Sequence, residues 1–452
     1  MSRPLHDAGV ARLQAALRAT DPRDTIRLAK PSSNLFRFGK RDAAVGLPTD
    51  GLDSVIALDT EARTIEVGGL ITYERLVAAT LPHKLVPTVV PQLKTITVGG
   101  AVAGLGIESS SFREGLPHEA VREMDVLTGD GRVLTVFPGD DLFQALPNSY
   151  GTLGYAVRLV LDLDPVSNEI ELTHVRFSRP EEYFEAMHET CETRTHDGGK
   201  VDYVDGVVFS PTEMYMTVGS LRDDHAPTSD YTGQSIYYQS LRRQRHDRLT
   251  IHDYLWRWDT DWFWCSAAFG VQNRFVRRLW PSYRRRSDVY RKLVRLDRKT
   301  GLTRTLARLG GGRREAVIQD VEVPIRQASR FLEWFCAEVP IRPIWVCPLA
   351  LSSARQWPLY PLGIGETYVN FGFWATVALD PQHERDHHNR RVEELVDDCG
   401  GHKSLYSTVH YGRAEFWRKY GGETYHALKN RYDATGRLPM LFDKVVTDSA
   451  TG

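Results

Sequence analysis

The sequence predicts an α+β fold of two domains followed by a C-terminal segment. The chain has 452 residues, which is enough for two or three domains with a sizeable buried core. The expected strands and helices do not alternate regularly, which disfavours a parallel βαβ sheet. A region rich in Gly, Val and Thr, with short strands and turns, ends at Pro165, which closes a long strand. We therefore divide the chain into residues 1–165, 166–400 and 401–452.

The composition is that of a globular protein. Apolar residues make up 42% of the chain and charged residues 25%, which excludes a collagen-like, disordered or integral-membrane protein. The formal net charge is -1, so we expect no nucleic-acid partner. Of the 57 basic residues, 46 are Arg, a bias that is typical of a high-GC bacterial source.

The cysteines and the first residues indicate the cellular location. The five Cys are widely spaced and form no CxxC pair, which disfavours a disulfide framework or a structural zinc site. The N-terminal residues lack the apolar run of a signal peptide, and no stretch of 18 apolar residues exists. We expect a cytoplasmic protein, bound at most peripherally to the inner face of the membrane. The sequence leaves the oligomeric state open.

Hydrophobic periodicity predicts the first elements. Val10, Leu13 and Leu17 share one face of an expected N-terminal amphipathic helix. Residues 121–127 and 132–137 flank an Asp-Gly turn, which is typical of a β-hairpin.

The same periodicity predicts the later elements. Residues 151–164 alternate as a long half-buried strand that ends at Pro165, with Val157 inside and Arg158 outside. The other expected elements are helices at 180–194, 382–398, 413–420 and 424–432, and strands at 201–210, 213–218, 344–351 and 367–377.

A glycine-rich stretch over residues 90–111 is the most informative segment. Gly99, Gly100, Gly104 and Gly106 allow close backbone approach and expose N–H groups, a combination that suits a pyrophosphate. The alternative interpretation is a packing turn without a ligand. The stretch lacks GxGxxG and a surrounding βαβ unit, so a Rossmann nicotinamide site is not predicted.

Several motifs in order resemble a known family. They are residues 97–100, 106–111, 115–116, 127–131, 142–143 and 151–154, with 403–407, 415–417 and 425–432 near the C-terminus. Together they resemble the vanillyl-alcohol oxidase / p-cresol methylhydroxylase (PCMH) superfamily of FAD enzymes, and more narrowly its Δ24-sterol reductase (diminuto/seladin) branch. The resemblance implies a PCMH-type FAD-binding domain, a separate α+β substrate (cap) domain and a C-terminal tail that returns to the flavin.

The resemblance also assigns the flavin site. The region that matches the first phosphate loop, residues 29–36, has no glycine, so its serines and Asn34 would take that role. No His or Cys lies between residues 90 and 116, and His118 is expected to be a surface or hydrogen-bonding residue, so FAD should be non-covalent. The residues expected to bind FAD are Ser32, Ser33, Asn34, Thr97, Val98, Gly99, Gly100, Gly104, Gly106, Ile107, Glu108, Ser109, Ser110, Ser111, Gly115, Gly151, Thr152 and Gly154.

The implied function is reduction of an isolated C=C bond in a lipid. The Arg bias makes the sequence look more like the bacterial group that reduces methylene-branched fatty acyl chains, as in actinobacterial tuberculostearate synthesis. We expect phospholipid as the carrier of the chain and NADPH as the electron source. Three alternatives stay open: a sterol side-chain reductase, an FAD-linked alcohol oxidase, and a membrane-surface binding protein without chemistry.

A C-terminal cluster supplies candidates for the proton donor. The resemblance brings Lys403, Tyr406, His410 and Tyr411 near the flavin, and we expect Tyr411 or His410 to donate the proton. The alternative is ordinary packing of two short helices.

Two further patterns carry weaker hypotheses. Residues 383–387 match HExxH, but the polar neighbours disfavour a zinc site, and we expect no metal. Residues 241–299 hold 16 Arg and Lys, 6 Asp and Glu and five of the ten Trp, which fits docking on an anionic membrane. A solvated basic face over an aromatic core fits equally well, and RNA binding fits less well.

Overall fold

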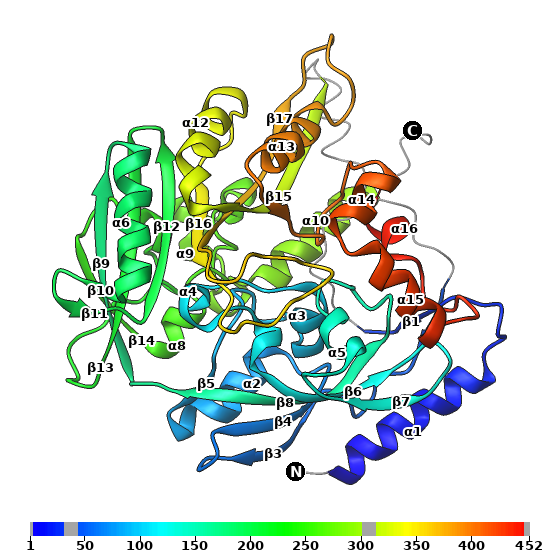
Figure 1. The fold of residues 1–452 in the computed structure, drawn as a ribbon. Coiled ribbons are helices and arrows are strands. Elements are labelled where there is room, and N and C mark those ends of the chain that lie inside the picture. The colour runs from blue at the N-terminus through cyan, green and yellow to red at the C-terminus, as the bar shows by residue number, and fades with distance from the viewer. Residues whose placement is uncertain (1–2, 31–43, 301–312, 447–452) are drawn as a thin grey trace.

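The computed structural model describes residues 3–30, 44–300 and 313–446 and contains two large sheets (Figure 1). The first sheet is antiparallel, in the order β3-β4-β8-β6-β7, with β5 also paired to β8. Its strands are β3 (Val55–Asp59), β4 (Thr64–Gly68), β5 (Leu85–Pro87), β6 (Val121–Leu127), β7 (Val133–Val136) and β8 (Tyr155–Pro165). The predicted hairpin is confirmed as β6 and β7.

The N-terminal helix is confirmed as α1 (Arg3–Ala19), which buries Leu13 and Leu17. It lies below the first sheet in Figure 1, and Arg3 pairs with Glu66 of β4. Shorter elements complete this region: the parallel pair β1 (Ile26–Leu28) and β2 (Val45–Leu47), and the helices α2 (Tyr73–Thr80), α3 (Val98–Gly104), α4 (Ser111–Glu114) and α5 (Asp141–Ala145).

The long strand β8 differs from the prediction in two respects. It begins at Tyr155, because residues 151–154 form a turn. Arg158, expected at the solvent, is buried and ion-paired: its guanidinium lies 2.8 Å from Glu66 Oε1, 2.7 Å from Glu123 Oε1 and 2.6 Å from Asp125 Oδ2. Carboxylates of the neighbouring strands neutralise its charge, so the position is polar without being exposed.

The second sheet has eight strands in the order β14-β9-β13-β12-β16-β17-β15-β18, all antiparallel. They are β9 (Glu169–Phe177), β12 (Tyr203–Ser210), β13 (Glu213–Arg222), β14 (His246–Thr250), β15 (Arg314–Pro324), β16 (Ile344–Leu349), β17 (Tyr368–Ala378) and β18 (His402–Lys403). The predicted strands at 201–210, 213–218, 344–351 and 367–377 are confirmed. A separate two-stranded hairpin, β10 (Thr195–His196) and β11 (Gly199–Lys200), precedes β12 in the chain.

Both faces of this sheet are buried, so alternate residues enter different cores. Val204 and Val346 pack in the core beneath α6 (Pro180–Thr193), α12 (Ala328–Glu338) and α13 (His387–Asp398). Val207 and Trp345 face the other way, into a core shared with the first sheet. Period-two alternation therefore distributes side chains between two apolar layers.

The remaining chain covers the space between the sheets. Residues 225–300, which we call the insertion, include β14 and carry α7 (Tyr237–Ser240), α8 (Ile251–Leu255), α9 (Arg274–Leu279) and α10 (Ser287–Thr300). The predicted C-terminal helices are confirmed as α14 (Arg413–Lys419) and α15 (Gly422–Tyr432), and α16 (Leu441–Val445) follows them. The mixed α+β class is confirmed, and no helix among the described residues has the length and apolarity needed to cross a membrane. The division at residues 165 and 400 stays a prediction; β18, from the third segment, pairs with β15.

Candidate active site

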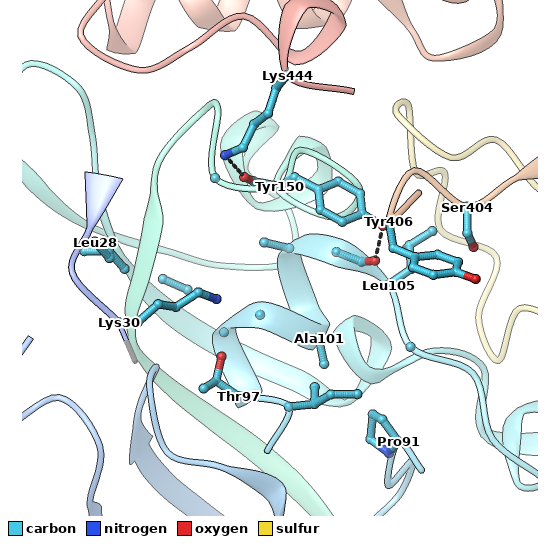
Figure 2. A pocket seen from close by; sticks show the side chains of 18 of the residues that line it. Leu28, Lys30, Pro91, Thr97, Ala101, Leu105, Tyr150, Ser404, Tyr406 and Lys444 are labelled. Atoms are coloured by element: carbon cyan, nitrogen blue, oxygen red, sulfur yellow. Dashed lines mark hydrogen bonds between the residues drawn. The ribbon is translucent and has the colours of Figure 1, made fainter. Parts of the chain in front are cut away.

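A cavity of about 530 Å³ lies where the two sheets face each other. Its walls come from β1, from α3 and its flanking residues, from the insertion, from β15, β16 and β17, and from the C-terminal segment. Figure 2 shows Leu28 and Lys30 on one side of the cavity and Ser404 and Tyr406 on the other, with α3 between them.

The first turn of α3 is built from glycines that leave no room for a side chain. A Cβ at Gly99 would lie 2.8 Å from the carbonyl oxygen of Gly69 and 3.0 Å from that of Ala156. A Cβ at Gly100 would lie 2.7 Å from Thr97 Oγ1 and 3.9 Å from Lys30 Nζ. The helix therefore packs directly on the neighbouring backbone and presents a surface without side chains to the cavity.

This end of the cavity is suited to an anion. Lys30 and Arg27 line it, and both side chains are exposed. Desolvation, with a contribution from Arg291, lowers the pKa of Lys30, so an anionic ligand here would stabilise its charged form. The buried Thr97 hydroxyl has no hydrogen-bond partner among the described residues, and it lines the same wall. These groups fit the pyrophosphate of FAD.

Part of the predicted flavin set gathers around the cavity. Thr97, Gly99, Gly100, Gly104, Gly106, Ile107, Gly151 and Gly154 all line it. Ser32, Ser33 and Asn34 lie outside the described residues. Lys30, two positions before Ser32, lines the cavity and was missed by sequence reasoning.

The rest of the predicted flavin set does not line the cavity, and its assignment is corrected. Val98 is a core residue, and Gly115 is enclosed by Glu119 and the backbone of Ser352. Glu108 pairs with Arg257, and the hydroxyls of Ser109, Ser110, Ser111 and Thr152 bond to protein groups. Polar residues in a glycine-rich segment have the composition of a ligand-binding loop. Here, however, their side chains bond to Arg257 and Tyr254 and to nearby backbone groups.

The opposite end of the cavity is aromatic and includes the carboxyl group of Asp320. Trp262 and Phe263 of the insertion, and Trp345 and Trp374 of the second sheet, line this end together with Asp320, Ser404 and Tyr406. Trp374 Nε1 donates to Tyr406 Oη at 2.8 Å, and Ser404 Oγ donates to Glu322 Oε1 at 2.9 Å. The cavity thus joins a cationic, glycine-lined end to an apolar end with a few polar atoms.

Of the four predicted catalytic residues, Tyr406 alone lies on the cavity wall. Ser404 and Tyr406 face the cavity, so the alternate residue Lys403 points away and pairs with Glu393 at 2.6 Å in the core. Burial and nearby cations lower the pKa of His410 to about 3, so it is neutral at pH 7. Tyr411 packs against Tyr420 and under Lys419. Their assignment as proton donors is corrected.

His118 is not a surface residue. It is buried with its ring 4.2 Å from that of Trp357, and burial lowers its pKa to about 3. No His or Cys is among the described residues that line the cavity. The expectation of non-covalent FAD stays a prediction that this lining supports.

The HExxH pattern does not lie on one helix. α13 begins at His387, because Asp386 adopts a left-handed conformation with φ 61°. The His383 and His387 rings stack at 3.8 Å, and the described residues contain no group of three potential metal ligands. The expected absence of a metal stays a prediction.

The basic, tryptophan-rich segment is mostly interior. Trp256, Trp258, Trp262 and Trp264 are buried, so their assignment to a membrane interface is wrong. An exposed cluster of α9 and the following turn remains, in which Phe275 is 79%, Leu279 84% and Tyr283 70% exposed. Val276, Arg274, Arg278 and Arg284 are also exposed there, and we call these seven residues the α9 surface.

Comparison with known proteins places this site in context. Residues 10–136 match the family described as FAD binding domain. The chain is similar to Δ24-sterol reductase of Rattus norvegicus, at 28% identity over 412 residues, which cover 87% of this chain and 76% of the relative. A Δ24-sterol reductase homolog of Caenorhabditis elegans is 24% identical over 442 residues, 91% of this chain and 81% of the relative. Alditol oxidase from a Streptomyces species is 35% identical over 119 residues, 26% of this chain and 28% of that enzyme.

These matches agree with the glycine-lined end of the cavity, which belongs to the segment that matches the FAD-binding family or follows it closely. They support the predicted FAD-binding domain and the predicted similarity to the Δ24-sterol reductases. The chain is an FAD-dependent oxidoreductase that is similar to the Δ24-sterol reductases along most of its length.

Proposed function

We propose that this protein reduces the C=C bond of a methylene-branched fatty acyl chain, carried on a phospholipid, to a methyl branch. The relatives named as Δ24-sterol reductases support reduction of a C=C bond remote from activating groups. The observation that carries the choice of a phospholipid is the α9 surface, which joins exposed Arg side chains to exposed apolar ones. The same insertion supplies Trp262 and Phe263 to the cavity wall.

In this proposal residues 166–400 form the substrate domain and close the cavity over the flavin. When bound, FAD in its reduced form supplies a hydride. Lys30, Arg27 and Thr97 would hold the pyrophosphate, while the aromatic wall would exclude water and stabilise positive charge that develops on the alkene. The electron donor to FAD is proposed to be NADPH, which would reach the flavin without a Rossmann motif.

A sterol side chain is the second candidate substrate, since similarity to sterol reductases extends over 87% of this chain for the rat protein. The alcohol oxidase alternative has narrower support, because the similarity to alditol oxidase covers 26% of the chain. Reaction of the reduced protein with air separates these classes. The reduced flavin of an oxidase is reoxidised rapidly by O₂, whereas that of a reductase is reoxidised by the alkene substrate.

The test is an anaerobic single turnover. Dithionite-reduced holoenzyme is mixed with vesicles containing a phospholipid with a methylene-branched acyl chain, and flavin reoxidation is followed with mass analysis of the chain. We expect stoichiometric formation of the methyl-branched product. Turnover of a Δ24-sterol but not of the phospholipid would contradict the acyl proposal in favour of the second candidate. Profiling lipids of a host with and without the gene provides the matching cellular test.

The α9 surface is proposed to dock on an anionic bilayer. Each Arg near such a surface contributes about 1 kcal/mol, so Arg274→Glu/Arg278→Glu/Arg284→Glu should weaken binding to phosphatidylglycerol vesicles by roughly 100-fold or more. Phe275→Ser/Leu279→Ser should also weaken it, because the apolar side chains would no longer enter the acyl boundary.

Vesicle co-sedimentation at rising salt is the measurement, since exposed charges are screened over about 8–10 Å at physiological ionic strength. The matched control is Phe137→Ser/Ile364→Ser, which removes two exposed apolar side chains outside the α9 surface. Equal binding of the wild-type protein to neutral and anionic vesicles would show that the α9 surface is not an anionic-lipid site.

A further inference from the structure

We propose that Asp320 is the acid that protonates the substrate alkene. The inference rests on the proposed reductase function and names a residue for its central step. Asp320 lies in the middle of β15, on the face of the second sheet that forms the aromatic end of the cavity. Its neighbours Gln319 and Val321 point to the opposite face, where Gln319 bonds to Asn389 of α13.

The strand partner of Asp320 makes room for its carboxyl group. Asp320 is paired in register with Gly372 of β17, and a Cβ on Gly372 would lie 2.6 Å from Asp320 Oδ1 and 2.8 Å from the Trp374 ring. The carboxyl therefore lies across the neighbouring strand and against Trp374. A glycine at this one position of a central strand is explained by that close approach.

The surroundings favour the neutral acid. Burial and the like charge of Glu322 raise the pKa of Asp320 well above its ordinary value, and a hydrogen bond with Tyr406 offsets this only in part. Glu322, on the same strand, and Tyr406, from the C-terminal segment, are the titratable groups that act on it among the described residues. Asp320 is in no described ion pair, and Oδ1 has no described hydrogen-bond partner.

Two neighbours are poorer candidates for the acid. Glu322 accepts hydrogen bonds from Tyr360 and Ser404 and does not line the cavity. Tyr406 lines the cavity, but burial and the nearby Asp320 carboxyl raise the pKa of its phenol, which makes it a weaker acid. A buried carboxylic acid kept neutral at pH 7 is a competent donor.

The proposed step adds a proton from Asp320 and a hydride to the two carbons of the alkene. The O–H bond of neutral Asp320 breaks while the alkene electron pair forms a C–H bond at the terminal methylene carbon. The branching carbon becomes a tertiary cation, which the faces of Trp374 and Trp345 stabilise. That cation accepts a hydride, which reduced FAD supplies, and FAD is left oxidised. The Asp320 carboxylate regains its proton from water.

The first test replaces the acid by its amide. Asp320→Asn should bind FAD and be reduced by dithionite like the wild-type protein, but reoxidation by the methylene-branched phospholipid should slow about 10²–10⁴-fold. Glu333→Gln, an exposed carboxylate on α12, is the control and should react at the wild-type rate. Equal rates for Asp320→Asn and the wild-type protein would overturn the proposal, whereas a wild-type protein that turns over neither the phospholipid nor a sterol would overturn the proposed function instead.

A second readout needs no substrate. The infrared C=O stretching band of a neutral carboxylic acid should be present in the wild-type protein at pH 7 and weakened in Asp320→Asn, with Glu333→Gln unchanged. An identical band in Asp320→Asn would show that this carboxyl is ionised and would overturn the proposal.

Neighbouring variants test how the acid is positioned. Gly372→Ala should displace the Asp320 carboxyl and slow reoxidation while FAD stays bound.

The pH dependence gives a further test. In the wild-type protein the rate of reoxidation should fall as the pH rises through the pKa of Asp320. Glu322→Gln removes the like charge, lowers that pKa and should move this fall to lower pH. A pH profile unchanged in Glu322→Gln would contradict the effect of the Glu322 charge on the pKa of Asp320.

Discussion

Replacing Gly100 with Val is expected to give a folded protein that purifies without flavin. The new Cβ would lie 2.7 Å from Thr97 Oγ1, and its two methyl groups would fill the space between Thr97 and Lys30. That space is where the pyrophosphate is expected, so the substitution removes the binding surface without touching the core. The measurement is flavin absorbance per protein, with circular dichroism to establish folding.

The matched control for this experiment is Gly139→Val, because no atom lies within 4 Å of a Cβ at that position. It should keep its flavin. Full flavin occupancy in Gly100→Val would contradict the placement of the pyrophosphate at α3. Because we predict non-covalent binding, acid precipitation of the wild-type protein should release FAD into the supernatant.

Replacing Arg257 with Met is expected to destabilise the protein by about 3–5 kcal/mol, the usual cost of breaking a buried ion pair. The Arg257 side chain is 0% exposed, and its Nη2 lies 2.6 Å from Glu108 Oε1 and 2.7 Å from Asp205 Oδ2. Its removal leaves two buried carboxylates without a cation. Since Glu108 lies between α3 and α4 and Asp205 lies on β12, the loss falls on the contact between this segment and the second sheet.

The pH dependence of this variant has a definite sign. Burial already raises the pKa of Glu108, and without the Arg257 charge the folded-state pKa of Glu108 should rise further. A raised folded-state pKa means that stability is lost as the pH rises, so Arg257→Met should be less destabilised at pH 5 than at pH 7. Urea unfolding at both pH values measures this. Arg179→Met, which removes an exposed pair with Glu182, is the control and should cost about 1 kcal/mol or less. Equal losses in the two variants would contradict the role of Arg257.

Much of the fold was predictable because its signals are local. The Asp-Gly turn of the first hairpin and the alternation of β8 require only neighbouring residues. Arg158 was misplaced because alternation records polarity, and the three carboxylates that neutralise it come from β4 and β6. The sequence alone does not show which charged residues on different strands form ion pairs.

The part of the site that is lined by glycines could be predicted from the sequence. The part that depends on which strands pair, and in which register, could not. Gly99 and Gly100 reach the cavity as expected, since only a missing side chain permits their approach. Asp320 was missed because its role depends on Gly372, which lies 52 positions later and meets it only through the register of β15 and β17. His410 and Tyr411 were expected near the flavin because of the family resemblance. The pairing of Lys403 with β15 places Ser404 and Tyr406 at the cavity instead.

The two-sided burial of the second sheet makes its strand register a determinant of chemistry. A one-residue slip of β15 would send Asp320 beneath α13 and bring the apolar Val321 to the cavity. The same slip in β16 would exchange Trp345 for Val346. Single-residue insertions or deletions in these strands therefore change the reactive surface and both apolar layers at once, so these strands should tolerate substitution more readily than any change of length.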